Sequence, residues 1–195
     1  FERATDFPHF EAMLHAGHPD RQLVVRTLAW SADEVDLMPR PKNFGDLQQH
    51  LTAQKADVIF AAFGFNESFG GLDRLPEFRA RLVKLLTTLK TSAYNGRSAP
   101  RIVLVSPIAS ENVRGVPAAD LNNARLAAYT RAMAAVAAEQ QVGFVDVFAA
   151  TKAALDDPAT DLTFNGVHLE DRGYALLARR LYEGTFVAPP PATTS

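Results

Sequence analysis

The chain has 195 residues, of which 47% are hydrophobic and 22% are charged, values typical of one globular domain with a sizeable core. Its formal net charge of −2, without a cluster of Lys and Arg, argues against nucleic-acid binding. The chain has no cysteine, which excludes disulfides, thiolate metal sites and a cysteine nucleophile, and no apolar stretch is long enough to span a membrane.

Helical and strand patterns alternate along the chain. In order, the sequence predicts a helix over residues 7–16, a strand over 23–28, a helix over 47–54, a strand over 58–63, a helix over 77–89, a strand over 102–105, a helix over 119–140, a strand over 144–147 and a helix over 174–182. The strand segments are continuously apolar, as expected for parallel strands covered on both faces. The alternation predicts an α/β fold, a three-layer α/β/α sandwich with a parallel sheet.

The two ends of the chain differ from this regular pattern. The first predicted element is a helix, so a first strand, often central in doubly wound sheets, is absent, and we expect the protein to continue upstream of Phe1. The C-terminal residues are rich in Pro, Thr and Ser, which is typical of a tail or linker. The predicted organisation is an N-terminally truncated domain over residues 1–187 and a tail over 188–195, which we expect to tether the domain to others.

Ligands of open α/β sheets bind beyond the carboxyl ends of the strands, so the loops there are candidates for a site. Gly64-Phe65-Asn66-Glu67 follows the run over residues 58–63. Glycine lets the backbone leave a strand sharply, and the amide of Asn66 is a suitable donor to a developing oxyanion. The alternative is that Asn66 caps a turn or helix, a common use of asparagine.

Two further loops carry candidate groups. His168 precedes the last predicted helix, and histidine is the usual general base at neutral pH, although a loop histidine is more often a surface residue. The segment Ala29-Trp30-Ser31-Ala32-Asp33 follows the first apolar run, and a backbone N–H there is a candidate oxyanion donor. Trp30, the single tryptophan, is expected to pack in the core. The other histidines, at positions 9, 15, 18 and 50, lie in or beside helical segments without a motif.

These loops, in this order, resemble the sequence blocks of the SGNH/GDSL hydrolase superfamily, which has a flavodoxin-like fold. Gly64-Phe65-Asn66-Glu67 is similar to the third block, Gly-x-Asn-Asp, with Glu in place of Asp. Asn165-Gly166-Val167-His168 is similar in spacing to the last block, Asp-x-x-His, and Ala32 stands where the second block has Gly. The resemblance implies that His168 is the catalytic base and that Asn66, with the backbone at Ala32 and Gly64, forms an oxyanion hole.

The sequence departs from the superfamily pattern at two places. The first block, which carries the serine nucleophile, is absent, and Ser31, Ser68 and Ser106 lack the strand–Gly–x–Ser turn that presents an activated hydroxyl. Asn165 stands where the triad acid is usual. The same replacement in a serine protease lowers kcat by about 10⁴-fold. Some members of the superfamily work as Ser-His dyads, so the change is compatible with activity.

The resemblance implies a carboxylic ester hydrolase that acts on short acyl esters, including carbohydrate acetyl esters, through an acyl-enzyme. Residues 56–69 and the segment around His168 are similar to a subgroup in large multidomain proteins of planctomycetes and related bacteria, and the family resemblance favours an extracytoplasmic location. The alternative function is a catalytically degenerate binding or spacer module. A flavin-binding electron carrier shares the fold type but requires a phosphate-binding loop, which the sequence lacks. No cofactor and no metal are expected.

Overall fold

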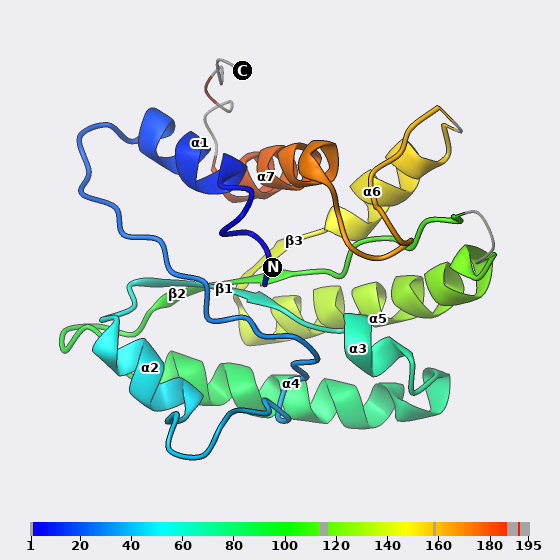
Figure 1. The fold of residues 1–195 in the computed structure, drawn as a ribbon. Helices are drawn as coiled ribbons and strands as arrows, with labels where there is room; N and C mark the ends of the chain where they lie inside the picture. Colours follow the sequence, from blue (N-terminus) through cyan, green and yellow to red (C-terminus); the bar gives the residue numbers. More distant parts are fainter. Residues whose placement is uncertain (1, 114–116, 158, 187–190, 192–195) are drawn as a thin grey trace.

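A parallel three-stranded sheet forms the centre of the computed structural model, which describes residues 2–113, 117–157, 159–186 and 191 (Figure 1). The strands β1 (Val58–Ala62), β2 (Arg101–Val105) and β3 (Gly143–Val145) lie side by side in that order. Ala62 is opposite Val105, and Val105 is opposite Val145, so the three strands end together at one edge. The predicted α/β fold with a parallel sheet is therefore confirmed.

One face of the sheet is covered by α2 (Leu47–Ala53), α4 (Leu75–Lys90) and α5 (Ala119–Gln140) (Figure 1). Apolar residues of α4 at helical spacing, including Leu82 and Leu86, are fully buried together with Tyr129 and Met133 of α5. The start of α2 is fixed by Asp46, whose side chain accepts a hydrogen bond from the backbone N–H of Gln49 at 2.8 Å.

The opposite face of the sheet is covered by α1 (His9–Gly17), α6 (Val147–Leu155) and α7 (Asp171–Thr185) (Figure 1). The rings of Phe10 on α1 and Phe60 on β1 meet edge to face with centroids 5.2 Å apart. Leu177 and Leu181 of α7 are buried with the valines on this side of β2 and β3. The two cores, one on each side of the sheet, make the three layers that the sequence predicted.

Two short helices follow β1 at the carboxyl edge of the sheet. These are α3 (Phe65–Ser68) and the 3-10 turn η1 (Leu72–Arg74). Neither was predicted, because segments of four and three residues are too short to show a helical periodicity. α6 was also missed, since the apolar run over 144–147 was assigned wholly to a strand. In the structure the strand ends at Val145, and Asp146 caps α6 by accepting from the Ala149 N–H at 2.9 Å.

The strand predicted over residues 23–28 is not formed. This segment is irregular backbone, part of a long connection between α1 and α2. A strand needs a hydrogen-bonded neighbour, and none of the described residues forms a strand beside β1 on the side away from β2. Its apolar side chains still pack inward in part, since Leu28 contacts the core beneath the sheet.

The predicted tail over residues 188–195 lies outside the described residues, apart from Pro191. Within the described part of the chain, no helix is long and apolar enough to cross a membrane.

Candidate active site

His168 lies on the loop that leads into α7, and Asn165 holds its imidazole. The Asn165 Oδ1 atom accepts the backbone N–H of His168 at 2.9 Å, and the Asn165 Nδ2 atom lies 2.9 Å from His168 Nδ1. With this orientation, the amide donates to Nδ1, so the imidazole proton of the neutral ring is on Nε2. A general base needs a free lone pair on Nε2, and a carboxylate at position 165 would provide it by accepting from Nδ1–H.

The amide of Asn165 also allows the opposite tautomer. Its Oδ1 atom lies 3.1 Å from His168 Nδ1, close enough to accept an N–H from that nitrogen. The assignment of oxygen and nitrogen in an amide follows from the hydrogen bonds around it. Oδ1 already accepts a backbone N–H, so the arrangement with Nδ2 facing the ring satisfies more groups. Asn165 therefore orients the ring but does not select the basic tautomer.

The loop that carries His168 is fastened to the loop after β2. The Oε2 atom of Glu111 accepts from the Thr163 backbone N–H at 2.8 Å and from the Thr163 hydroxyl at 2.6 Å, and the Glu111 N–H donates to the Gly166 carbonyl at 2.9 Å. Gly166 has φ 90°, and a Cβ there would lie 2.8 Å from the Glu111 carbonyl oxygen. Because Glu111 follows β2, His168 is held at the carboxyl edge of the sheet.

The Nε2 side of His168 faces the first residues of the chain. Glu2 Oε1 lies 4.0 Å from Nε2. The Phe164 ring is stacked on the imidazole with centroids 5.5 Å apart, and the Arg3 guanidinium lies 5.0 Å above the Phe164 ring. The His168 side chain nevertheless keeps 43% of its surface exposed, so Nε2 is open to a reacting group.

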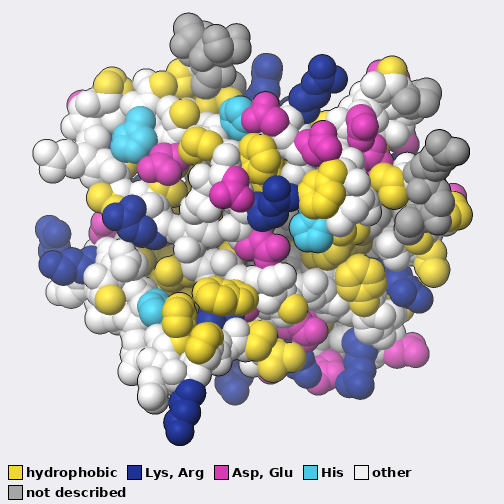
Figure 2. All heavy atoms as spheres, viewed as in Figure 1, with side chains coloured by type: hydrophobic (Ala, Val, Ile, Leu, Met, Phe, Trp, Pro, Cys, Tyr) yellow, Lys and Arg dark blue, Asp and Glu magenta, His cyan; other side chains and the backbone are white. Residues whose placement is uncertain are grey.

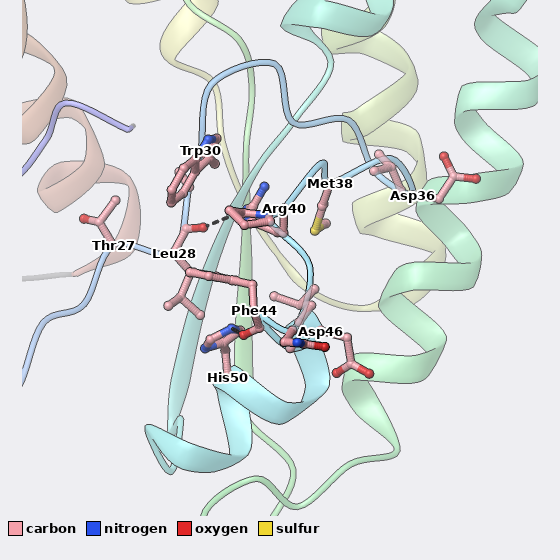
Figure 3. Close-up of a pocket in the computed structure, with 15 residues that line it drawn as sticks. Thr27, Leu28, Trp30, Asp36, Met38, Arg40, Phe44, Asp46 and His50 are labelled. Carbon is pink, nitrogen blue, oxygen red and sulfur yellow. Dashed lines mark hydrogen bonds between the residues drawn. The ribbon is translucent and has the colours of Figure 1, made fainter.

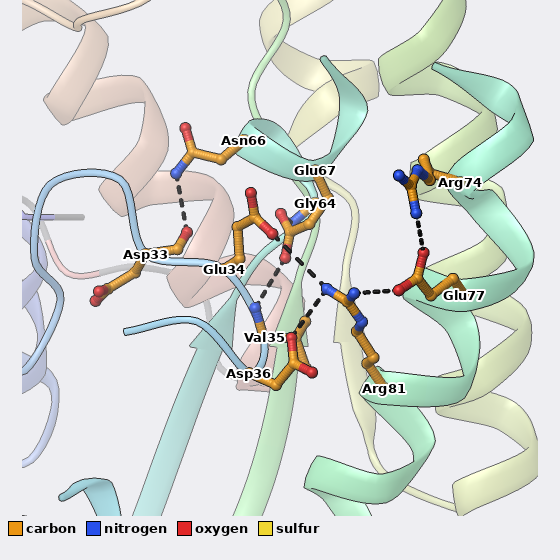
Figure 4. A network of polar contacts seen from close by, with 10 residues as sticks. All are labelled: Asp33, Glu34, Val35, Asp36, Gly64, Asn66, Glu67, Arg74, Glu77 and Arg81. Carbon is orange, nitrogen blue, oxygen red and sulfur yellow. Dashed lines mark hydrogen bonds and ion pairs between the residues drawn. The ribbon is translucent and has the colours of Figure 1, made fainter. Parts of the chain in front are cut away.

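The other half of the candidate site is the turn between β1 and α3 (Figure 4). Gly64 has φ 94°, a conformation that favours glycine. Asn66 donates from Nδ2 to the backbone carbonyl of Asp33 at 2.9 Å. An amide nitrogen carries two hydrogens, so one remains for a developing oxyanion. The contact also supports the alternative use of Asn66, which is to fix the neighbouring loop.

Glu67 is a buried clamp between the two loops of this half, a role that nothing in the sequence indicates beyond its place in the block. Its carboxylate accepts from the Gly64 N–H at 2.8 Å and the Val35 N–H at 3.0 Å, with 8% of the residue exposed (Figure 4). Burial raises the pKa of Glu67, while the backbone hydrogen bonds act in the opposite direction. The clamp sets the distance between the turn at Gly64 and the loop at Ala32.

Ala32 has φ 64°, a left-handed conformation that costs an L-residue about 1–2 kcal/mol. The second block of the superfamily has Gly where Ala32 stands, and the positive φ at this position is one that glycine adopts without this cost. The turn is braced by Asp33, whose Oδ2 atom accepts the Trp30 backbone N–H at 2.9 Å. Both Asp33 oxygens also bind Arg40, at 2.6 and 2.8 Å, and this hydrogen bonding raises the pKa of Arg40.

A cavity of about 600 Å³ opens beside this turn, between the segment at residues 27–30 and the segment that leads into α2 (Figure 3). Trp30, Arg40, Phe44 and His50 line it. The expectation that Trp30 packs in the core is wrong, because 47% of the residue is exposed at this cavity. The Trp30 ring lies on a surface turn. This turn stays exposed because the strand predicted over residues 23–28 does not form.

Two of the three candidate nucleophiles, Ser106 and Ser68, are buried and hydrogen-bonded. The Ser106 hydroxyl accepts the backbone N–H groups of Val147 and Phe148, both at 2.9 Å, and the residue is 2% exposed. Ser68 is 3% exposed and donates to the Phe65 carbonyl at 2.7 Å. Both hydroxyl groups are therefore engaged in hydrogen bonds with the backbone. Ser31 is exposed, but it lies next to Ala32 on the irregular loop, without a strand before it.

The structure brings the predicted residues together as two pairs at the carboxyl edge of the sheet: Asn66 with the Asp33 loop, and Asn165 with His168. The other histidines have structural contacts. His9, for example, lies 2.7 Å from Asp171, and His50 contacts the Phe44 carbonyl. Among the described residues, no group of three or more His, Asp or Glu is placed to hold a metal ion.

The chain belongs to the GDSL-like lipase/acylhydrolase family, whose model matches residues 3–176. The expected enzyme class, an ester hydrolase of this type, is thereby confirmed at the level of the family. No curated protein matches the chain.

Solved structures of the same fold include the acetylxylan esterase Axe2 from Geobacillus stearothermophilus. One Axe2 variant has a TM-score of 0.67 at 24% identity, covering 90% of this chain and 78% of that chain. Another has a TM-score of 0.70 at 22% identity, covering 94% and 82%. LAE5, an alpha/beta hydrolase from the metagenome of Lake Arreo, Spain, has a TM-score of 0.65 at 23% identity, covering 92% and 80%.

Three Axe2 structures are catalytic mutants, in which alanine replaces a serine, an aspartate or a histidine. In Axe2 the histidine follows the aspartate by three positions.

Proposed function

We propose that this domain hydrolyses esters of short acyl groups, carbohydrate acetyl esters among them. The observation that carries the proposal is the pairing of His168 with Asn165 on a loop at the carboxyl edge of the sheet, where the turn after β1 supplies the Asn66 amide. Family membership and the esterase neighbours support the same chemistry.

The reaction proceeds through an acyl-enzyme. A serine hydroxyl attacks the ester carbonyl while His168 Nε2 takes the hydroxyl proton. The oxyanion accepts hydrogen bonds from the second Asn66 N–H and the backbone N–H of Ala32, with the Gly64 turn beside them. The C–O bond to the alcohol then breaks, and the alcohol leaves with the proton from His168. Water then attacks the acyl-enzyme while His168 takes a proton from it. The bond between the acyl carbon and the serine oxygen breaks, the serine oxygen takes the proton back from His168, and the carboxylic acid is released.

The nucleophile is proposed to lie on a segment upstream of Phe1. Two observations support this placement. The hydroxyls of Ser68 and Ser106 are buried and hydrogen-bonded, and the Nε2 atom of His168 faces the start of the chain, with Glu2 at 4.0 Å. The first described residue therefore lies beside the nitrogen that would act as the base.

A second function, a non-catalytic binding or spacer module tethered to other domains, is favoured by the Asn165 geometry. With Nδ2 facing Nδ1 at 2.9 Å, the resting imidazole carries its proton on the nitrogen that should accept one. The strained φ of 64° at Ala32 also favours the non-catalytic module.

Active-site labelling separates the two functions. A chain extended by about one strand and turn upstream is treated with a fluorophosphonate, and the modified residue is mapped by mass spectrometry. We expect one upstream serine to be labelled, with the label lost in His168→Ala because the base that activates it is gone. His15→Ala, at an exposed histidine of α1, is the matched control and should label normally. If a folded sample takes no label, the hydrolase proposal is contradicted and the binding or spacer module is the better account.

A further inference from the structure

Two aromatic side chains form an exposed platform at the cavity beside the Ala32 turn. Trp30 is 47% exposed and Phe44 is 41% exposed, and their rings meet edge to face with centroids 5.7 Å apart. Figure 2 shows hydrophobic side chains gathered next to a histidine in the region of α2. Exposed aromatic rings that share a cavity mark a binding surface more often than isolated ones do.

The platform is held in place before any ligand arrives. The Arg40 guanidinium lies 5.3 Å from the centre of the Trp30 ring and covers one face of it. Asp33 binds both Arg40 and the backbone N–H of Trp30. The ring and its support therefore share one carboxylate anchor, and a ligand that stacks on Trp30 has little side-chain entropy to remove.

The charges around the cavity favour a neutral ligand rich in hydroxyl groups. Arg40 is already neutralised by Asp33 through two hydrogen bonds, so it offers little to an anion. The carboxylates of Asp36 and Asp46, two other lining residues, are also engaged: Asp36 pairs with Arg81 at 3.0 Å, and Asp46 accepts a backbone N–H at the start of α2 at 2.8 Å. Arg40, Asp36 and Asp46 therefore offer little to attract an ion, while the carboxylates can still accept from O–H donors. Among biological ligands, a neutral sugar combines such donors with an apolar C–H face that stacks on an aromatic ring.

We propose that this cavity, defined by Trp30, Phe44 and Arg40, binds the sugar rings of a neutral oligosaccharide. Its volume of about 600 Å³ lies within the range of small-molecule sites and accommodates more than one pyranose ring. The same loop leads directly from Trp30 to Ala32 and to Asp33, whose carbonyl binds Asn66. The cavity therefore adjoins the proposed oxyanion hole, and the inference names the substrate class of the proposed hydrolase, on which it rests in this respect.

The single tryptophan makes binding directly observable, because all tryptophan fluorescence of the chain comes from Trp30. Xylotetraose, cellotetraose and partially acetylated xylotetraose are titrated into the protein, with glycerol as the control for bulk solvent effects. We expect a saturable change of intensity and emission maximum with at least one tetrasaccharide. No saturable change with any of them in a folded sample overturns the proposal.

Variants then locate the binding site. Phe44→Ala keeps the fluorophore and should weaken binding by about tenfold, since an aromatic contact of this kind is worth about one decade of affinity. Leu121→Ala, at a residue on α5 that is 59% exposed and does not line the cavity, should leave binding unchanged. Equal loss in both variants, or none in Phe44→Ala, contradicts the assignment. Trp30→Ala, followed by calorimetry, should lose binding, and Trp30→Tyr should recover part of it.

These outcomes separate the inference from the proposed function, because binding is measured without turnover. Saturable fluorescence changes without ester hydrolysis by the upstream-extended chain support the sugar site and contradict the hydrolase. Hydrolysis of a simple acetyl ester without any oligosaccharide binding supports the proposed hydrolase and contradicts the proposed sugar site.

Discussion

The chemistry of this domain depends first on which nitrogen of His168 carries its proton. A carboxylate at position 165 would accept from Nδ1–H and leave the Nε2 lone pair free. The amide of Asn165 presents a donor and an acceptor to the same nitrogen, at 2.9 and 3.1 Å. Only one of these two contacts leaves the Nε2 lone pair free, and residue 165 offers no negative charge to the Nδ1 side of an imidazolium.

Asn165→Asp should raise turnover in a catalytically competent, upstream-extended chain. The carboxylate fixes the basic tautomer and stabilises the imidazolium, an effect worth up to about 10⁴-fold in a serine-protease triad. The measurement is kcat for a short acyl ester, with thermal unfolding to confirm that the fold is intact. A marked fall in kcat without unfolding would mean that the amide has another role in the site.

Ala32→Gly should stabilise the fold or leave its stability unchanged. Glycine removes the left-handed strain at φ 64°, about 1–2 kcal/mol, and loses about 0.5–1 kcal/mol through greater freedom in the unfolded chain. Ala135→Gly is the matched control. This exposed position lies within α5, where glycine should cost about 1 kcal/mol. Urea unfolding of both variants gives the comparison, and equal losses would contradict the strain at Ala32.

At the scale of elements, α7 and the loop before it act as one unit. Gly173, in the first turn of α7, lies so close to this loop that a Cβ would be 2.5 Å from the Leu162 carbonyl oxygen and 2.7 Å from Leu169 Cδ2. The loop between these two residues carries His168. The close approach explains why a glycine, and no larger residue, stands five positions after the histidine.

Gly173→Ala should therefore disturb the position of His168 as well as the packing of α7. Overpacking of this kind costs about 1–3 kcal/mol. In Gly96→Ala the new Cβ meets no atom within 4 Å, so only the strain of φ 74° contributes. We expect a lower unfolding midpoint in both variants, and a shifted His168 imidazole resonance in NMR spectra only in Gly173→Ala. An unmoved resonance would show that the loop adapts by other means.

Elements with a strong local pattern were predicted well. The Ala-rich helix over residues 119–140 has the predicted bounds, since its propensity needs no support from neighbours. The apolar run over 23–28 was assigned to a strand on the same kind of signal. A strand, however, forms only when it hydrogen-bonds to a neighbouring strand. The apolar run over residues 23–28 does not show whether such a neighbour is available.

At the scale of the whole molecule, the sequence predicted the layers and the loops of the site but not what braces them. Asn66, Asn165 and His168 could be proposed as site residues because the spacing of the sequence blocks is visible in the sequence alone. The Glu67 clamp and the Asp33–Arg40 pair join loops that only the fold brings together. Trp30 was misplaced for the same reason, because its burial depended on a strand that does not form.

The long connection over residues 18–46, between α1 and α2, is the segment that we expect to unfold locally most often. Within this fully described segment, few backbone N–H groups bond to backbone carbonyls, and none of residues 22–29 does, whereas β2 is paired on both sides. Hydrogen exchange should therefore be fastest over 22–29 and slowest in β2. Mass spectrometry of exchanged peptides gives the order, and equal protection would contradict it. Part of the cavity wall, at residues 27–29, thus lies in this least protected segment, next to the anchored Trp30, and a bound ligand would extend the protection from Trp30 into that segment.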